Sequence, residues 1–173
     1  MQKKIISKKK FLEINISSAK KMSKNKQLKK DSLKVISEAD KFRWIHQATW
    51  LGEPILNLPH DMFAIQEIIW KSRPEYIIEI GVAWGGSLLF QSMLIDHLGG
   101  KKIIGVDIFL PNDLKKRLNS HNKLAKKIKL IEGSSTDEKT IKSIKKIVKN
   151  SKKVLVILDS HHSEDHVLEE LKI

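Results

Sequence analysis

One stretch of the chain, residues 74–87, constrains the fold more than any other. It reads PEYIIEIGVAWGGS, in which the short apolar run Tyr76–Ile80 leads into a glycine-rich turn and then into a second apolar run with helical spacing. Short β-rich apolar runs are typical of buried parallel strands. A strand, a glycine turn and a helix form the first half of a βαβ unit, which binds ligands at the carboxyl ends of its strands.

The glycine spacing and a nearby acid indicate which ligand this turn would take. Ala83 stands where the dinucleotide fingerprint G-x-G-x-x-G has its second glycine, between Gly81 and Gly85. Glu79 lies at the mouth of the strand, where an acid suits a cationic, sugar-bearing ligand better than a diphosphate. S-adenosylmethionine (SAM) fits that description. The alternative is a turn that needs glycine for packing alone.

Length and composition restrict the class of protein. The 173 residues suffice for one core of ordinary domain size. The absence of cysteine excludes disulfides, thiolate metal sites and cysteine nucleophiles, and it is compatible with the cytoplasm. No apolar run approaches the roughly 18 to 20 residues of a membrane span. Only Ile5 and Ile6 separate the first lysines from the next, so we expect no signal peptide and a cytoplasmic location.

Basic residues gather at the amino-terminal end. Residues 1–43 hold 14 Lys/Arg against 4 Asp/Glu, in a chain whose net charge is +13. We expect residues 1–38 to form a flexible basic tail and residues 39–173 to form the folded domain, because apolar and aromatic content rises from there. The apolar residues at positions 11–16 have a spacing that favours neither helix nor strand.

The basic tail has two alternative partners besides solvent. Lysine clusters attract anionic membrane surfaces through the surface potential and nucleic acids through counterion release. Arginine, which grips phosphates bidentately and reads guanines, occurs only three times in the chain. We therefore expect no specific nucleic-acid partner, and peripheral contact with a membrane or glycolipid surface stays an alternative to a solvated tail.

Residues 50–61, WLGEPILNLPHD, precede the first predicted strand. Two prolines and a glycine predict a rigid irregular segment here. Asp61 is expected to cap the following helix, in which Ile65, Ile68 and Ile69 share one face. The aromatic residues before and on this segment either roof a pocket or cover the edge of the sheet.

Three further apolar runs predict strands at residues 102–108, 128–131 and 154–158. Lysine-rich segments between them predict helices, the first of them over residues 114–127. Alternating strands and helices indicate an α/β fold with a parallel sheet of about four strands.

Polar residues stand at the ends of the predicted strands 102–108 and 128–131. Asp107 stands 26 residues beyond the first glycine of the turn, where a carboxylate can accept both hydroxyls of a ribose. An acid is also a common strand terminator. Ser134 is expected to border an adenine ring. Ser135 and Glu138 fit a capping box for the next helix.

The last predicted strand is followed by DSHHSEDHV, from Asp159 to Val167. An aspartate at a strand mouth with three nearby histidines could bind a divalent metal or supply a general base. The spacing matches no zinc pattern, and a hard oxygen ligand favours magnesium. The alternative is that Asp159 and Ser163 cap a helix and that the histidines are surface residues.

Three groups of residues, taken together, resemble the cephalosporin hydroxylase / rhamnosyl O-methyltransferase family. They are Trp50-Leu51-Gly52-x-Pro54 with Leu58-Pro59-x-Asp61, then Glu79-Ile80-Gly81-Val82-Ala83-x-Gly85-Gly86-Ser87, and finally Leu158-Asp159-Ser160-x-His162-Ser163-x-x-His166-Val167. The resemblance covers about residues 45–171. It implies the Rossmann-like three-layer αβα sheet of class I SAM-dependent methyltransferases, with relatives that methylate glycolipid sugars or act in cephalosporin tailoring.

The cofactor-binding residues that we predict are Glu79, Gly81, Gly85, Ser87, Asp107 and Ser134. By similarity, Glu79 and Gly81 would line the methionine end of SAM, Asp107 the ribose and Ser134 the adenine side. Asp159 would match the first of the carboxylates that hold a magnesium ion in the family. We predict Asp159 and His162 as catalytic, with His162 as a nearby proton acceptor.

The expected reaction is methyl transfer from SAM to a hydroxyl of a sugar, glycolipid or related small molecule, in lipid or secondary-metabolite biosynthesis. Because the sulfonium is already activated, the protein must align acceptor oxygen, methyl carbon and sulfur and help to remove one proton. Magnesium at Asp159 would make a bound oxygen more acidic.

The family continues past the helix after Asp159 into a strand that ends in a Glu-Asp pair and supplies further metal ligands, whereas this chain ends at Ile173. We therefore expect a C-terminally truncated sheet of about four strands instead of seven. Its last strand would have an unpaired edge, which a homo-oligomer could cover. A non-catalytic fragment that binds SAM or a partner is the alternative function. Trp84 and His161 stand where other residue types are expected.

Three carboxylates are decisive for the predicted methyl-donor site. Glu79, Asp107 and Asp159 are each expected at the carboxyl end of a strand. We expect them to converge on one crevice along the top of a single parallel sheet.

Overall fold

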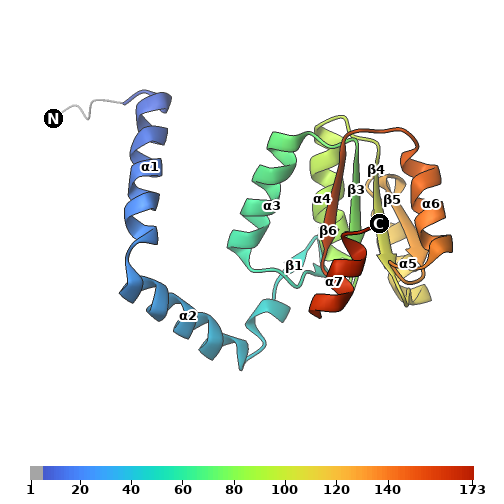
Figure 1. Ribbon diagram of the computed structural model, residues 1–173, viewed down its shortest axis with the longest axis horizontal. Helices are drawn as coiled ribbons and strands as arrows, with labels where there is room; N and C mark the ends of the chain where they lie inside the picture. Colours follow the sequence, from blue (N-terminus) through green and yellow to red (C-terminus); the bar gives the residue numbers. More distant parts are fainter. Residues whose placement is uncertain (1–5) are drawn as a thin grey trace. The chain divides into compact units, whose positions relative to one another are not determined.

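The computed structural model describes residues 6–173, which divide into two compact units, one ending at Trp44 and the other spanning Ile45–Ile173 (Figure 1). The first unit holds helices α1 (Lys8–Ser23) and α2 (Lys26–Asp40). The predicted boundary at residue 38 therefore falls inside α2. Residues 11–16, whose apolar spacing favours neither helix nor strand, lie within α1. Flexibility of this segment stays a prediction.

The second unit is built on a parallel sheet of four strands in the order β5-β4-β3-β6. The strands are β3 (Tyr76–Ile80), β4 (Lys102–Asp107), β5 (Ile128–Glu132) and β6 (Val154–Leu158). Ile78 of β3 is in register with Ile104 of β4 and with Val156 of β6. The predicted α/β class and the four parallel strands are confirmed, and β6 pairs with β3 alone among the described residues.

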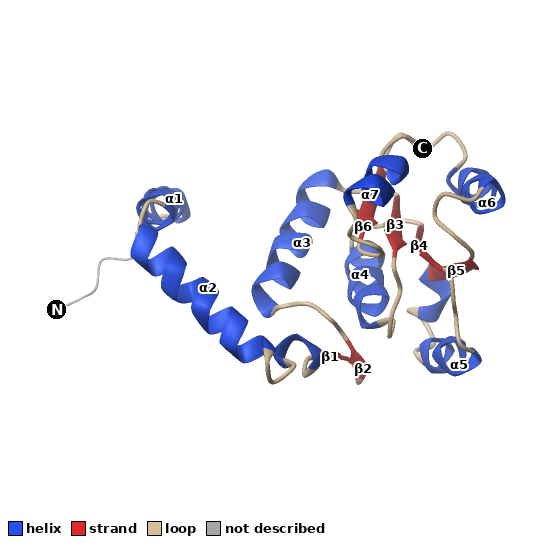
Figure 2. Ribbon diagram, turned by 60° about the horizontal axis from the view of Figure 1, so that its bottom comes forward, coloured by secondary structure: helices blue, strands red, loops and turns tan. Residues whose placement is uncertain are grey.

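Helices cover both faces of the sheet, which gives three layers (Figure 2). One face carries α3 (Pro59–Ser72), α4 (Gly86–His97) and α5 (Asn112–Ser120), which contribute Ile69, Leu88 and Leu114 to one core. The other face carries α6 (Glu138–Val148) and α7 (Glu164–Glu170), and here Ile78 and Ile104 form a second core against α6. Successive strand residues point to opposite faces, so Ile77 and Ile78 enter different cores.

The segment expected to be irregular begins with a hairpin. Strands β1 (Thr49–Trp50) and β2 (Glu53–Pro54) pair antiparallel across Leu51 and Gly52. Both turn residues have positive φ, 52° and 88°, as a two-residue hairpin turn requires. Trp50 packs edge-on against Phe90 of α4, with ring centroids 5.0 Å apart, so it covers the helix layer.

Helix boundaries differ from three sequence predictions. Asp61 lies in the first turn of α3 and not at its N-cap, which is Leu58. The capping box at Ser135 does not form, because α6 begins after Asp137 and Ser135 bonds elsewhere. The helix predicted over 114–127 ends as α5 at Ser120, and a short 3₁₀ turn, Ala125–Lys127, follows.

A half-buried ion pair joins the hairpin to α5. Glu53 of β2, 11% exposed at its side chain, pairs with Arg117, whose Nε also contacts the exposed Asp113 at 2.8 Å. His121 Nε2 lies 3.7 Å from the same Glu53 carboxylate. Removing one partner of a buried ion pair leaves the other charge buried and unpaired, which destabilises the fold.

The turn after β3 is held against the turn after β6. The Gly81 amide donates to Val106 at 2.9 Å and the Asp159 amide donates to Ile80 at 2.8 Å. Gly81 has φ +96°, and a Cβ built on it would overlap the Asp159 carbonyl oxygen. Glycine is therefore needed here for close approach as well as for conformation.

We expect Arg117→Met to lower the free energy of unfolding by about 2 to 3 kcal/mol, because Glu53 would keep its charge without its partner. Asp113→Asn is the matched control, since it removes the exposed partner and should change stability by less than about 0.5 kcal/mol. Urea unfolding of both variants tests this. Equal effects of the two substitutions would contradict it.

Gly81→Ala should destabilise the fold by about 3 kcal/mol or more, through a strained φ and a clash with the main chain. Gly99→Ala is the control: Gly99 also has positive φ, +77°, but an added Cβ meets no atom within 4 Å. It should cost only about 1 to 2 kcal/mol. Thermal unfolding distinguishes the two variants. A similar loss of stability in both would show that the close approach of Gly81 to the Asp159 main chain does not contribute to stability.

Candidate functional site

Two cavities adjoin at the carboxyl edge of the sheet. The larger has a volume of about 500 Å³ and the smaller about 260 Å³. Gly81, Ala83 and Asp159 line both, so the glycine turn and the start of the β6 loop form the boundary between them. The larger volume lies within the usual range for cofactor sites.

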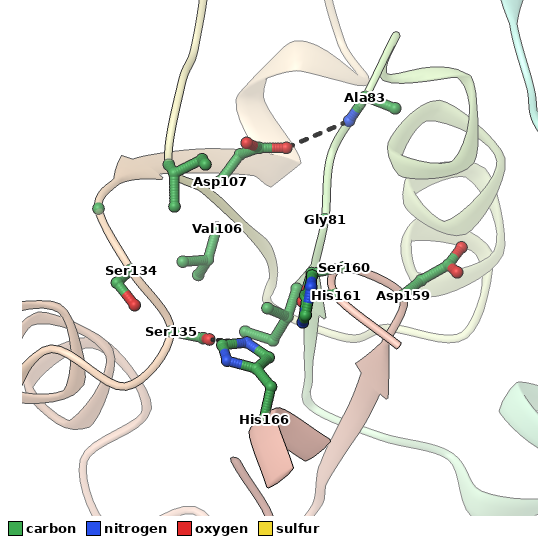
Figure 3. Close-up of a pocket in the computed structure, with 13 residues that line it drawn as sticks. Gly81, Ala83, Val106, Asp107, Ser134, Ser135, Asp159, Ser160, His161 and His166 are labelled. Carbon is green, nitrogen blue, oxygen red and sulfur yellow. Dashed lines mark hydrogen bonds between the residues drawn. The ribbon is translucent and has the colours of Figure 1, made fainter. Parts of the chain in front are cut away.

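The larger cavity is lined by the ends of all four strands (Figure 3). Val106 and Ile108 supply apolar wall, while Asp107, Ser134 and His166 supply polar groups. In Figure 3 Asp107 faces the turn at Ala83, and Ser134, Ser135 and His166 lie at the other side of the cavity. An apolar wall with polar groups at two ends suits a nucleoside, whose base is flat and whose sugar carries hydroxyls.

Asp107 holds the glycine turn in place. Its Oδ2 accepts hydrogen bonds from the amides of Val82 at 2.9 Å and Ala83 at 3.4 Å, and its Oδ1 accepts one from Phe109 at 3.2 Å. A carboxylate offers about four acceptor sites, so it can still accept from a ribose hydroxyl. Ala83 adopts the left-handed conformation, with φ 46°, in the position where the dinucleotide fingerprint has glycine.

Glu79 is buried beneath the turn and lines the smaller cavity. Its Oε2 accepts a hydrogen bond of 3.0 Å from Gln91 Nε2. Burial raises the pKa of Glu79 from 4.5 to about 8; the Ser87 hydrogen bond opposes this shift, the Asp159 charge adds to it and Gln91 opposes it. A cation placed in the smaller cavity would favour the charged carboxylate.

Gly85, Gly86 and Ser87 also line the smaller cavity, together with Pro54 to Asn57 from the segment before α3. Asp159 and His162 lie there too, with Asp159 Oδ1 3.6 Å from His162 Nε2 and both side chains substantially exposed. A carboxylate near an exposed imidazole can orient it and support proton transfer at the mouth of a site.

The three carboxylates are brought to one edge of the sheet but not into one crevice. Asp107 and Asp159 share the larger cavity, whereas Glu79 and Asp159 share the smaller one. The expectation of a single crevice is therefore corrected. The residues of the glycine turn lie between Glu79 and Asp107, because the strand that carries Glu79 continues directly into that turn.

A polar cluster beside the larger cavity was not predicted. Glu170 of α7, 3% exposed at its side chain, has an Oε1 that accepts from Ser135 Oγ at 2.6 Å and Ser160 Oγ at 3.3 Å. His166 Nε2 lies 3.1 Å from the same oxygen, and Glu170 Oε2 has no hydrogen-bond partner within residues 6–173. The cluster ties α7 to the β5 and β6 loops.

Gln91 and Glu170 were not predicted as site residues, for different reasons. Gln91 is a polar residue within the apolar run of α4, one turn after Ser87, and this i, i+4 pair was a readable signal. Glu170 gives no such signal, because a glutamate near the end of a short helix normally faces solvent.

The donors around Asp159 do not amount to a metal site. Within residues 6–173 no group of three His, Cys, Asp or Glu side chains is placed to hold an ion. Magnesium prefers several oxygen ligands in octahedral geometry. Asp159 and the nearby His162 do not reach that number, so the magnesium role of Asp159 stays a prediction.

The raised pKa of Glu79 predicts a pH-dependent stability. The folded chain keeps a proton on Glu79 up to about pH 8, and the unfolded chain releases it near 4.5. This contribution is therefore complete below pH 4.5 and is lost as the pH rises toward 8. Relative to Glu79→Gln, the wild type should lose about 2 to 4 kcal/mol of unfolding free energy between pH 5 and 8.

Urea unfolding at both pH values measures this difference. Glu132→Gln, an equivalent change at an exposed position, is the control and should run parallel to the wild type. A parallel course for Glu79→Gln would contradict the buried, protonated carboxyl.

Sequence comparison places this site in a known group of proteins. A family model described as Rhamnosyl O-methyltransferase/CmcI matches residues 42–173. The rhamnosyl O-methyltransferase of Mycobacterium leprae (strain TN) is 35% identical over 135 residues, covering 76% of this chain and 56% of the relative. That of Mycobacterium bovis (strain BCG / Pasteur 1173P2) is 31% identical over 130 residues, covering 73% and 51%. The chain thus spans about half the length of the curated relatives it matches.

Solved structures give the same answer for the fold. A structure described as "cmcI-D160 Mg-SAM" superposes with a TM-score of 0.54 at 22% identity, covering 72% of this chain and 50% of that one. Another, described as "CmcI-N160 apo-structure", gives 0.55 at 22% identity, covering 74% and 52%. The matched residues include both cavities and every predicted site residue. The chain therefore belongs to the rhamnosyl O-methyltransferase/CmcI family.

Proposed function

We propose that the chain binds SAM across the two cavities and transfers its methyl group to a hydroxyl oxygen. The observation that carries this proposal is that two acids lie on different sides of the glycine turn. Asp107 lines the larger cavity, and the buried Glu79 lines the smaller one. The nucleoside would occupy the larger cavity, with its ribose at Asp107 and its base toward Ser134. The methionine end would occupy the smaller cavity beside Glu79.

The charge of SAM fits this assignment. Its sulfonium is cationic, and Glu79 is the acid whose ionisation a nearby cation would favour. The amides of the turn and Ser87 would contact the cofactor where glycine allows close approach. The names of the curated relatives and the description of one solved neighbour as "Mg-SAM" support SAM as the donor.

Asp159 and His162 are the residues that we assign to proton removal. They lie where the smaller cavity opens, and the 3.6 Å separation lets the carboxylate stabilise a protonated imidazole. The acceptor hydroxyl would approach from that side, since the sulfonium must face it in line. A sugar or glycolipid acceptor, and a place in lipid or secondary-metabolite biosynthesis, are suggested by the relatives called rhamnosyl O-methyltransferases.

A non-catalytic SAM-binding role is the second candidate, and the isolated carboxylate at Asp159 favours it. The neighbour described as "Mg-SAM" motivates a magnesium ion, yet the described residues offer no group of three ligands at this place. We therefore assign no reaction step to magnesium. A methyl-transfer assay with sugar and glycolipid acceptors, with and without magnesium, separates the two candidates: binding without turnover supports the second.

Isothermal titration with SAM and with S-adenosylhomocysteine, which lacks the sulfonium charge, tests the assignment of Glu79. SAM affinity should rise with pH up to about 8, as the sulfonium stabilises the ionised carboxylate, whereas the thioether analogue should show little change. Glu79→Gln should weaken SAM binding about tenfold and the analogue by less than about threefold.

Glu132→Gln, outside both cavities, should leave both ligands unaffected. The same pH dependence for both ligands would overturn the role of Glu79. Absence of binding by either ligand would overturn the proposed function itself.

A further inference from the structure

Helices α1 and α2 lie outside the part of the chain that matches the family, which begins at residue 42. Neither helix contains a buried residue. Their large apolar side chains are about half exposed; they include Phe11, Leu12, Ile14, Ile16, Met22, Leu28, Leu33 and Val35. Exposed apolar side chains gathered in one short segment indicate an interaction surface.

The apolar and basic residues of α1 are only partly separated around the helix, because Ile14 lies near Lys21 and Lys8 lies near Ala19. Leu12, Ile16 and Ala19 follow one another at intervals of four and three residues, so they share a face of the helix. Lys10 and Lys21, which are eleven residues apart, share the opposite face. A helix of this kind can bury its apolar face at an interface while its lysines stay in water.

Helix α2 repeats the arrangement. Leu28, Val35 and Ala39 lie on one face, and Lys30 and Lys34 lie on the opposite side, which Leu33 shares. Among the described residues no helix is long and apolar enough to cross a membrane. The geometry therefore favours helices that lie in the plane of a surface.

We propose that α1 and α2 form a surface that binds an anionic phospholipid bilayer. Charge complementarity favours this occupant, because residues 1–43 carry 14 Lys/Arg against 4 Asp/Glu. Both helices are without arginine, the residue most suited to phosphate forks and base edges in nucleic acids. A nucleic acid would also leave the apolar face unused, whereas a bilayer accommodates both faces.

This surface also gives the reaction a location, provided that the proposed function holds: a lipid-linked sugar acceptor would be presented at the same bilayer. Membrane binding and SAM binding are otherwise independent. Either can fail without the other, because the residues that carry them belong to different units.

Co-sedimentation of the full chain with unilamellar vesicles tests the proposal. We expect binding to phosphatidylcholine vesicles that contain about one third phosphatidylglycerol, little binding to pure phosphatidylcholine, and a steep loss as salt rises. The triple variant Lys10→Gln, Lys21→Gln, Lys34→Gln should weaken binding on the order of 100-fold, since each lysine near an anionic surface contributes about fivefold.

Matched controls separate this surface from bulk charge. Lys142→Gln, Lys145→Gln, Lys146→Gln removes the same charge from α6 of the other unit and should leave vesicle binding within about twofold. The apolar variant Leu12→Ser, Ile16→Ser keeps the charge but should weaken binding at least about tenfold. The buried core of the second unit contains none of these positions, so its thermal unfolding should be unchanged.

Three results would overturn the proposal. Equal losses from the α6 triple variant and from the α1/α2 triple variant would mean that only net charge matters. Full binding by the apolar variant would mean that the helices do not insert their apolar faces. Binding of duplex DNA through the same lysines, with no binding to anionic vesicles, would assign the surface to a nucleic acid.

Discussion

The site depends on the main chain at Gly81, which is held from two sides. Its amide donates to Val106 of β4, and its α-carbon lies against the Asp159 carbonyl at the end of β6. The Asp107 carboxylate then binds the next two amides, at Val82 and Ala83. These contacts join the ends of β3, β4 and β6. Gly81, Ala83 and Asp159 line both cavities, so the same contacts fix the wall between them. A side chain at Gly81 would separate the loops that form the boundary between the cavities.

Burial of Glu79 sets the charge beside the glycine turn, because it raises the pKa of this carboxyl. A carboxyl with a pKa near 8 is neutral over much of the physiological range and acquires its charge when a cation compensates for lost hydration. Gln91 and Ser87 come from one face of α4, so the helix that packs the core also supplies the groups that hold this acid. The same helix therefore links core packing to the wall of the smaller cavity.

The two units carry different candidate binding surfaces. The second unit contains every cavity residue that we assign to SAM, and it accounts for the family match. The first unit contributes a basic pair of helices with exposed apolar side chains and no buried residue. Under the two proposals, the second unit would carry the methyl transfer and the first unit the contact with a bilayer.

Local sequence was sufficient for the strands and for the glycine turn. The run at 76–80 and the run at 154–158 coincide with β3 and β6, because buried parallel strands are short, apolar and bounded by turn residues. Gly81 and Gly85 have positive φ, 96° and 85°, as suits the predicted glycine-rich turn. Asp107, at a strand end in a doubly wound pattern, lines the larger cavity, and its role toward a ribose stays a prediction.

Side-chain partnerships needed the tertiary structure. Ser135 matched a capping box, yet it bonds to Glu170, 35 residues away, because α7 returns to the β5 loop. Glu79 was recognised as an acid at a strand mouth, but its burial and its separation from Asp107 follow from how α4 and the turn pack around it. The sequence by itself determined the parallel sheet, the turn and the acids at strand ends, since these follow from periodicity and backbone conformation along the chain. Only the tertiary structure decided which acid is buried, which faces each cavity and which polar groups meet, because those depend on distances between residues remote in sequence.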